Sequence, residues 1–136
     1  MLLLDDADPR RDHLREAFLA LHSATITVPV ATGGVEAATR ACADINALAP
    51  DESLVVAALG SASLVLPAVS RSQRAQHRRI IEYLLLDPEL PPVTDAWPDA
   101  RVSVICDVGA EASLQARLRG WDLLRPEEIA DWQPPD

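Results

Sequence analysis

Residues 54–63 read Leu-Val-Val-Ala-Ala-Leu-Gly-Ser-Ala-Ser, an apolar run that ends abruptly in small residues. A continuous apolar run bounded by a turn is typical of a strand buried on both faces, as in parallel sheets flanked by helices. Pro67 follows shortly afterwards, and proline is tolerated in the first turn of a helix. The segment therefore predicts a central strand over residues 54–58, a tight turn, and a helix from about Ala62 to Gln76.

The rest of the chain alternates strand and helix in both directions. Further strands are expected at residues 2–4, 25–30, 80–86, 102–106 and 121–124. Apolar residues at helical spacing predict helices at residues 14–21, 35–48 and 110–119, with chain breaks at Gly33-Gly34 and Pro50. The alternation predicts an α/β fold: a three-layer parallel sheet of about six strands flanked by helices, with right-handed crossovers. We expect one domain over residues 1–132 and a frayed tail over residues 133–136.

Charge and composition exclude several classes of function. The chain has 21 acidic residues, a formal net charge of −9, and 12 Lys or Arg positions that are all arginine. This balance argues against a nucleic-acid partner and against a patch for anionic membranes. Residues 1–8, Met-Leu-Leu-Leu-Asp-Asp-Ala-Asp, turn acidic too soon for a signal peptide, so we expect none. No apolar run approaches the roughly 18 residues of a membrane span. We expect a cytoplasmic protein without a disulfide framework at Cys42 and Cys106, and we expect no cofactor and no metal.

Several short motifs carry a resemblance to a known family. Residues 58–62, Ala-Leu-Gly-Ser-Ala, have the small-x-nucleophile-x-small spacing of an elbow between a strand and a helix. Residues 64–68 read Leu-Val-Leu-Pro-Ala, residues 85–92 read Leu-Leu-Asp-Pro-Glu-Leu-Pro-Pro, and residues 116–121 read Ala-Arg-Leu-Arg-Gly-Trp. Jointly these motifs resemble the α/β-hydrolase family, in particular its small bacterial members. The resemblance implies a truncated α/β-hydrolase-like core, with residues 1–4 in the place of the third strand of the family and no lid domain.

The resemblance also implies that the nucleophile of a serine hydrolase is missing. The register of the elbow places Gly60 at the nucleophile position. Centring the elbow on Ser61 would put a leucine at a position that requires a small residue. Ser63 would lie inside the first turn of the helix and point away from the tip of the elbow.

The general base is missing as well. No histidine follows His77, whereas the family places its histidine after the last core strand. His13, His22 and His77 are expected in or beside helices, away from the site. Because a serine hydroxyl needs a positioned base, we expect no catalytic residues and no serine hydrolase activity.

A ligand site is expected where the strand order reverses. The family resemblance implies the strand order 2-1-3-4-5-6, which puts this switch point between the strands at residues 2–4 and 54–58. Ligands of such sheets bind beyond the carboxyl ends of the strands. The residues expected at this point are Asp5, Asp6, Gly60, Ser61, Ser63 and Asp87, with Asp107 near them. Backbone N–H groups of Ser61 and Ala62 would favour an anion there. The plainer interpretation is that Ser61 caps the helix and the aspartates are solvated loop residues.

Two functions from different classes fit these observations. The first is a non-catalytic accessory protein of bacterial natural-product biosynthesis that acts through a partner protein or a bound small molecule or peptide. Open sheet edges favour a homodimer or a heteromeric complex. The alternative is a non-hydrolytic enzyme, such as an isomerase, epimerase or cyclase, in which Asp5 or Asp87 moves a proton. A third interpretation keeps esterase activity through Ser61.

Overall fold

A computed structural model describes residues 1–31, 34–48 and 53–135 of the chain. Its centre is a six-stranded sheet in the order β2-β1-β3-β4-β5-β6, and every neighbouring pair is parallel. The strands are β1 (Leu2–Asp5), β2 (Ile26–Pro29), β3 (Ser53–Leu59), β4 (Arg79–Leu86), β5 (Arg101–Ile105) and β6 (Asp122–Leu124). The predicted α/β class, the parallel sheet and the strand order are confirmed.

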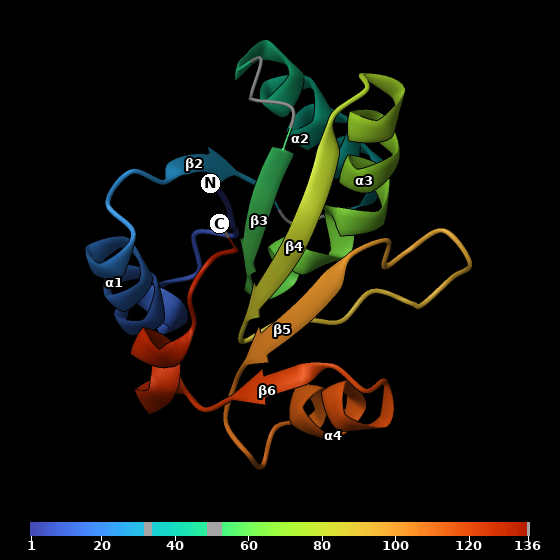
Figure 1. Cartoon of the computed structure of the whole chain (residues 1–136). Coiled ribbons are helices and arrows are strands. Elements are labelled where there is room, and N and C mark those ends of the chain that lie inside the picture. Colours follow the sequence, from blue (N-terminus) through green and yellow to red (C-terminus); the bar gives the residue numbers. More distant parts are fainter. Residues whose placement is uncertain (32–33, 49–52, 136) are drawn as a thin grey trace.

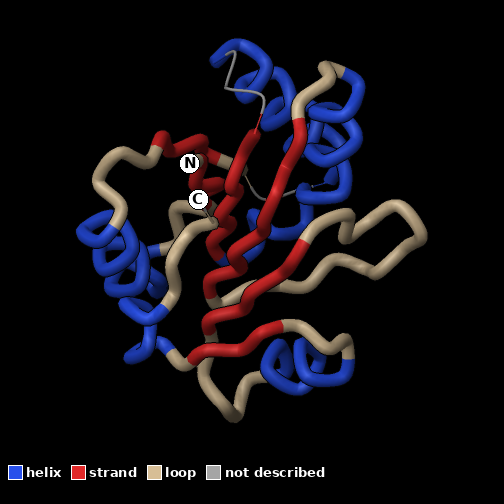
Figure 2. The backbone as a smooth tube through the Cα atoms, in the orientation of Figure 1, coloured by secondary structure: helices blue, strands red, loops and turns tan. Residues whose placement is uncertain are grey.

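Helices cover both faces of this sheet (Figures 1 and 2). The α-helices are α1 (Asp12–Leu21), α2 (Gly34–Leu48), α3 (Leu66–Ala75) and α4 (Glu111–Leu118). Three 3-10 helices accompany them: η1 (Pro9–Arg11), η2 (Gly60–Val65) and η3 (Pro126–Asp131). Figure 1 shows α1 and η3 on one side of the sheet and α2, α3 and α4 on the other. The result is the predicted three-layer arrangement.

Two hydrophobic clusters fill the space between these layers. Alternate residues of the strands point to opposite faces, so β1, β3, β4 and β5 each contribute buried residues to both clusters. The α2–α3–α4 side buries Leu4, Val56, Leu85 and Val104, among others. The α1–η3 side buries Leu3, Ala57, Leu84 and Ile105 together with Phe18 and Trp132. β3 is buried from Leu54 to Leu59, which explains why its sequence is apolar without alternation.

The helix predicted to start at Ala62 has a different beginning. The segment after β3 is the 3-10 helix η2, and the α-helix α3 starts only at Leu66, one residue before Pro67. Proline lacks the backbone N–H of a helix interior, so it fits the first turn of α3, where that N–H would have no partner. The predicted breaks at Gly33 and Pro50 lie outside the described residues.

The remaining boundaries follow local chemistry. Gly120 ends α4 with a φ of +72°, and Trp121 N–H donates to the carbonyl of Ala116 at 2.9 Å, a helix-ending bond that favours glycine. Pro29 ends β2, an edge strand, where its missing N–H removes no bond from the sheet interior. Within the described residues no helix is both long and apolar enough to cross a membrane.

A loop between β4 and β5 is fastened to the sheet by one aspartate. Tyr83 Oη donates to Oδ1 of Asp99 at 2.6 Å, and Ser70 Oγ donates to Oδ2 at 2.8 Å. The Trp97 ring packs edge-on against Tyr83 with a centroid distance of 5.5 Å. Burial, together with the adjacent Asp99, raises the pKa of Tyr83. Asp99 therefore holds the loop between β4 and β5 against Tyr83 of β4 and Ser70 of α3.

Candidate functional site

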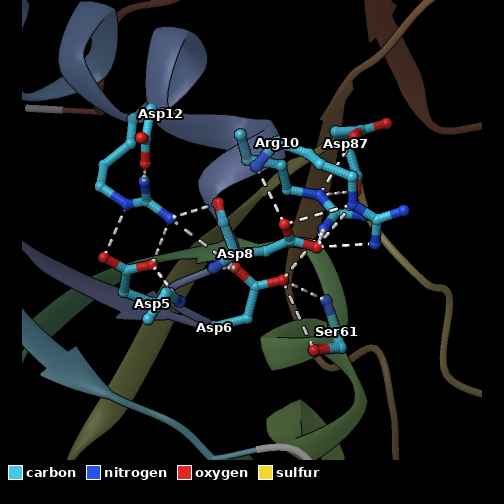
Figure 3. A network of polar contacts seen from close by, with 10 residues as sticks. Asp5, Asp6, Asp8, Arg10, Asp12, Ser61 and Asp87 are labelled. Atoms are coloured by element: carbon cyan, nitrogen blue, oxygen red, sulfur yellow. Dashed lines mark hydrogen bonds and ion pairs between the residues drawn. The ribbon is translucent and has the colours of Figure 1, made fainter.

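Most of the expected site residues meet at the carboxyl edge of the sheet. β1 delivers Asp5 and Asp6, β3 delivers Gly60 and Ser61, and β4 delivers Asp87. Figure 3 shows the side chains of Asp5, Asp6, Ser61 and Asp87 close to one another and to Arg10. Arg11 and Arg15 pair with the aspartates of this group. The strand order makes this convergence necessary, because β1, β3 and β4 are neighbours and run in one direction.

Gly60 lies where the side chain of any other residue would displace neighbouring side chains. Its φ is +60°, a left-handed conformation that costs a residue with a side chain. A Cβ built on Gly60 would lie 2.1 Å from Oδ2 of Asp6 and 2.8 Å from Cζ of Arg11. The space that a side chain at residue 60 would take is therefore occupied by a carboxylate and a guanidinium of the same chain.

Asp6 is the buried acceptor of the turn. Its side chain is 2% exposed, and its Oδ2 accepts from Ser61 N–H at 3.2 Å, from Ser61 Oγ at 3.5 Å and from Nη1 of Arg11 at 3.2 Å. Its Oδ1 accepts from Asp8 N–H at 3.1 Å. The N–H of Ser61, which was expected to receive the anion of a ligand, is already bound to an anion of the chain itself.

Arg11 connects the first and fourth strands. Its Nε donates to Oδ2 of Asp87 at 3.1 Å and to the Asp87 carbonyl at 3.3 Å, while its Nη1 donates to Oδ2 of Asp8 at 2.9 Å. The side-chain and backbone hydrogen bonds of Arg10 hold the pKa of Asp8 far below its ordinary value. The Asp8 carboxylate is consequently ionised at neutral pH.

Asp5 forms a separate pair that fixes α1 to β1. Arg15 donates from Nε to Oδ2 of Asp5 at 2.8 Å and from Nη2 to Oδ1 at 3.0 Å. The same guanidinium also pairs with Asp12, and the hydrogen bond to Asp5 is the main reason why the pKa of Arg15 is raised. Both carboxylate oxygens of Asp5 are therefore engaged by Arg15, and a ligand that contacts them must compete with this two-point pair.

Sequence reasoning missed the arginines of this network. We name as the arginine–aspartate network the set Asp5, Asp6, Asp8, Arg10, Arg11, Asp12, Arg15 and Asp87. Its signal was present in residues 5–15, where three arginines lie among four aspartates. No protein-family model, curated protein or solved structure matches this chain.

A groove opens beside the network at the switch point. It measures about 660 Å³, within the usual range of ligand pockets. We call it the switch-point groove; its lining residues are Asp6, Asp8, Arg10, Arg11, Val30, Ala31, Gly34, Val35, Ala37, Ala38, Ser61, Leu64, Val65 and Glu89. The expected residues Asp6 and Ser61 form part of its wall. Asp5 and Gly60 lie behind that wall.

Ser63 is not at a surface, contrary to its expected contact with a ligand. Its side chain is fully buried, and within the described residues its hydroxyl has no hydrogen-bond partner. Ser63 lies in η2, whose tight 3-10 winding turns it into the core rather than toward the groove. A ligand in the switch-point groove cannot reach this hydroxyl without a rearrangement of η2.

A second cavity of about 400 Å³ lies on the other side of Arg11, between α1 and η3. It is lined by His13, Asp87, Cys106 and Asp107, among other residues. His13, near the start of α1, lines this second cavity but not the switch-point groove. Burial, with the nearby Asp87, raises the pKa of Cys106 to about 11, so this thiol is a poor nucleophile at neutral pH.

The other two histidines are remote from these cavities. His22 packs against Phe18 and Trp132, with ring centroids 4.9 and 5.3 Å away. His77 lies beyond the end of α3, with a φ of +58°. Among the described residues, no three His, Cys, Asp or Glu side chains are grouped so that they could hold a metal ion.

Proposed function

We propose that this chain is a catalytically degenerate, α/β-hydrolase-like accessory protein that binds a small molecule in the switch-point groove. One observation carries the proposal: the space for a side chain at residue 60 is filled by Asp6 and Arg11. In a hydrolase elbow this space belongs to the nucleophile, and the next backbone N–H helps to stabilise the oxyanion. Here that N–H belongs to Ser61 and donates to Asp6.

The remaining geometry supports binding over hydrolysis. Ser61 Oγ is within 3.5 Å of the Asp6 carboxylate, and no histidine lines the switch-point groove. A hydroxyl without a positioned base stays protonated and unreactive at neutral pH. The groove, in contrast, offers apolar walls with a polar end, which is the usual composition of a small-molecule site.

The sheet edges support an additional protein partner. β2 and β6 are the outer strands, and Ile26 on β2 is 48% exposed. Unpaired strand edges with apolar side chains are surfaces that proteins commonly cover by association. We propose a homodimer or a heteromeric complex on this basis, in the setting of bacterial natural-product biosynthesis that the family resemblance suggested.

Two measurements test the proposal. A fluorophosphonate probe should not label the wild-type protein, whereas an active serine hydrolase added to the same sample is labelled. Native mass spectrometry of the gently purified protein should show a stoichiometric small molecule, whose release by Leu64→Asp would place it in the groove. Labelling of the wild type that disappears in Ser61→Ala would refute the loss of catalysis and restore the esterase interpretation.

A non-hydrolytic enzyme is the second candidate, and the second cavity favours it. His13, Asp87 and Asp107 line that cavity together, and such titratable groups are suited to moving protons. A retained molecule that the wild type converts into an isomer, but that His13→Gln leaves unchanged, would favour this candidate over a binding protein.

A further inference from the structure

The walls of the switch-point groove are apolar and partly uncovered. Val35 at the start of α2 is 83% exposed, and Leu64 in η2 is 48% exposed. Val30, Ala37 and Val65 also line the groove and are buried. Covering these apolar side chains with hydrocarbon removes them from water, which favours the binding of an aliphatic ligand.

The polar end of the groove carries one unpaired negative charge. Asp6 and Asp8 are paired with Arg10 and Arg11. Glu89 also lines the groove, is exposed, and has no ion pair or side-chain hydrogen bond with any described residue. Residues 32–33, 49–52 and 136, which lie outside the described ranges, contain no Lys, Arg or His.

An anionic ligand fits this end poorly. The guanidinium of Arg11 already has three carboxylate partners, and Arg10 is bound to Asp8 through two nitrogens. Ser61 N–H, the natural anion donor of the turn, is bound to Asp6. An incoming carboxylate or phosphate would have to break these bonds and approach a protein whose net charge is −9.

A positively charged ligand is favoured at this end of the groove, because it can pair with Glu89 without breaking an existing bond. Glu89 follows β4 closely, and its backbone N–H donates to the carbonyl of Gly60 at 3.2 Å, which fixes its backbone beside the elbow turn. From this place its carboxylate can pair with a positive charge at the polar end of the groove. A ligand that fits the whole groove therefore carries both a positively charged group and an aliphatic chain.

We infer that the switch-point groove binds a small aliphatic amine in its ammonium form, with Glu89 as the counter-ion and Val35 and Leu64 against the hydrocarbon. This inference rests on the proposed function, because it names the class of ligand for the same groove. It goes further in assigning a role to Glu89, which sequence reasoning did not place in the site.

The test compares three probes of equal length on the full chain: n-octylammonium chloride, 1-octanol and sodium octanoate. Amide chemical shifts of Val35, Ser61 and Leu64 report binding in the groove. The ammonium salt should bind most tightly and the octanoate most weakly. Each methylene removed from the ammonium probe should weaken its binding by up to about fourfold. Added salt should also weaken the binding of the ammonium probe, because it screens the ion pair with Glu89.

Matched variants test separately what the ammonium group and the hydrocarbon chain of the ligand contribute to binding. Glu89→Gln should weaken the ammonium probe by about two- to fivefold, the scale of an exposed ion pair, and leave octanol unchanged. Glu36→Gln makes the same charge change on α2 outside the groove and should alter neither probe. Leu64→Ser should weaken every probe, whereas Leu114→Ser, at a leucine that is 50% exposed on α4, should not.

The failures are distinguishable. Equal binding of octanol and octylammonium, unaffected by Glu89→Gln but weakened by Leu64→Ser, would overturn the amine and leave the groove as a binding site. Binding that none of these variants changes, or no binding of any probe, would overturn both the amine and the proposed groove. Preferential binding of octanoate would reverse the inferred charge of the ligand.

Discussion

Replacing Gly60 by alanine should destabilise the fold far more than the same replacement at Gly120. Both glycines have a left-handed backbone, with φ values of +60° and +72°. A Cβ at Gly120 meets nothing within 4 Å, whereas a Cβ at Gly60 lies 2.1 Å from Oδ2 of Asp6. The pair therefore separates backbone strain from the displacement of the arginine–aspartate network.

The expected magnitudes follow from these two contributions. A left-handed conformation costs alanine about 1–2 kcal/mol at either position. At Gly60 the methyl group must also push Asp6 away from Arg11 and Ser61, and breaking a buried ion pair costs about 3–5 kcal/mol. Arg11 can move its flexible end, which reduces this second cost. We expect a loss of about 3–6 kcal/mol in Gly60→Ala and about 1–2 kcal/mol in Gly120→Ala.

Urea unfolding followed by tryptophan fluorescence measures both losses. The double variant Asp6→Ala/Gly60→Ala tests the cause of the difference. Once Asp6→Ala has removed the carboxylate, the free energy of unfolding lost by adding Gly60→Ala should fall toward the loss in Gly120→Ala. Equal losses in Gly60→Ala and Gly120→Ala would refute the reasoning, since they would mean that Asp6 and Arg11 do not occupy the space beside residue 60.

Three further predictions concern other parts of the molecule. Iodoacetamide at pH 7.5 should modify Cys106 only after unfolding, since burial raises the pKa of this thiol to about 11; rapid labelling of the native protein would contradict this. Burial lowers the pKa of His22 below its ordinary value of 6.5, so its contribution to stability is present above pH 6.5 and is lost as the pH falls below it. His22→Phe should flatten the decline of thermal stability between pH 6.5 and 5, and an unchanged decline would assign it to other groups. Asp99→Ala should cost about 2–4 kcal/mol, because it leaves the hydroxyls of Tyr83 and Ser70 without their acceptor; a urea midpoint equal to that of the wild type would refute this role of Asp99.

The parallel sheet could be predicted from sequence patterning alone, whereas the strand order, and with it the edge that holds the site, was expected from the family resemblance. Apolar runs without alternation identify strands buried on both faces, and the helices between them require parallel crossovers. The small residues around Gly60 mark a close turn, which the structure contains. The start of α3 could not be placed, because six residues are too few to distinguish 3-10 from α-helical spacing.

The partners inside the site could not be predicted for a different reason. Hydrophobic periodicity places residues on faces, but it does not say which arginine reaches which carboxylate. Arg11 joins Asp6 to Asp87, residues that are far apart in sequence, and only the assembled sheet brings them together. Likewise the burial of Ser63 and the place of His13 in the second cavity depend on the packing of η2 and α1.

The span of the Arg11–Asp87 bridge has a consequence for folding kinetics. Its partners are 76 residues apart, so it can close only after β1, β3 and β4 have come together, and contacts between such distant segments form late. An interaction absent from the folding transition state affects mainly the rate of unfolding. What the bridge adds to stability therefore lengthens the lifetime of the native molecule, while the speed at which the chain reaches that state depends on the earlier pairing of its central strands.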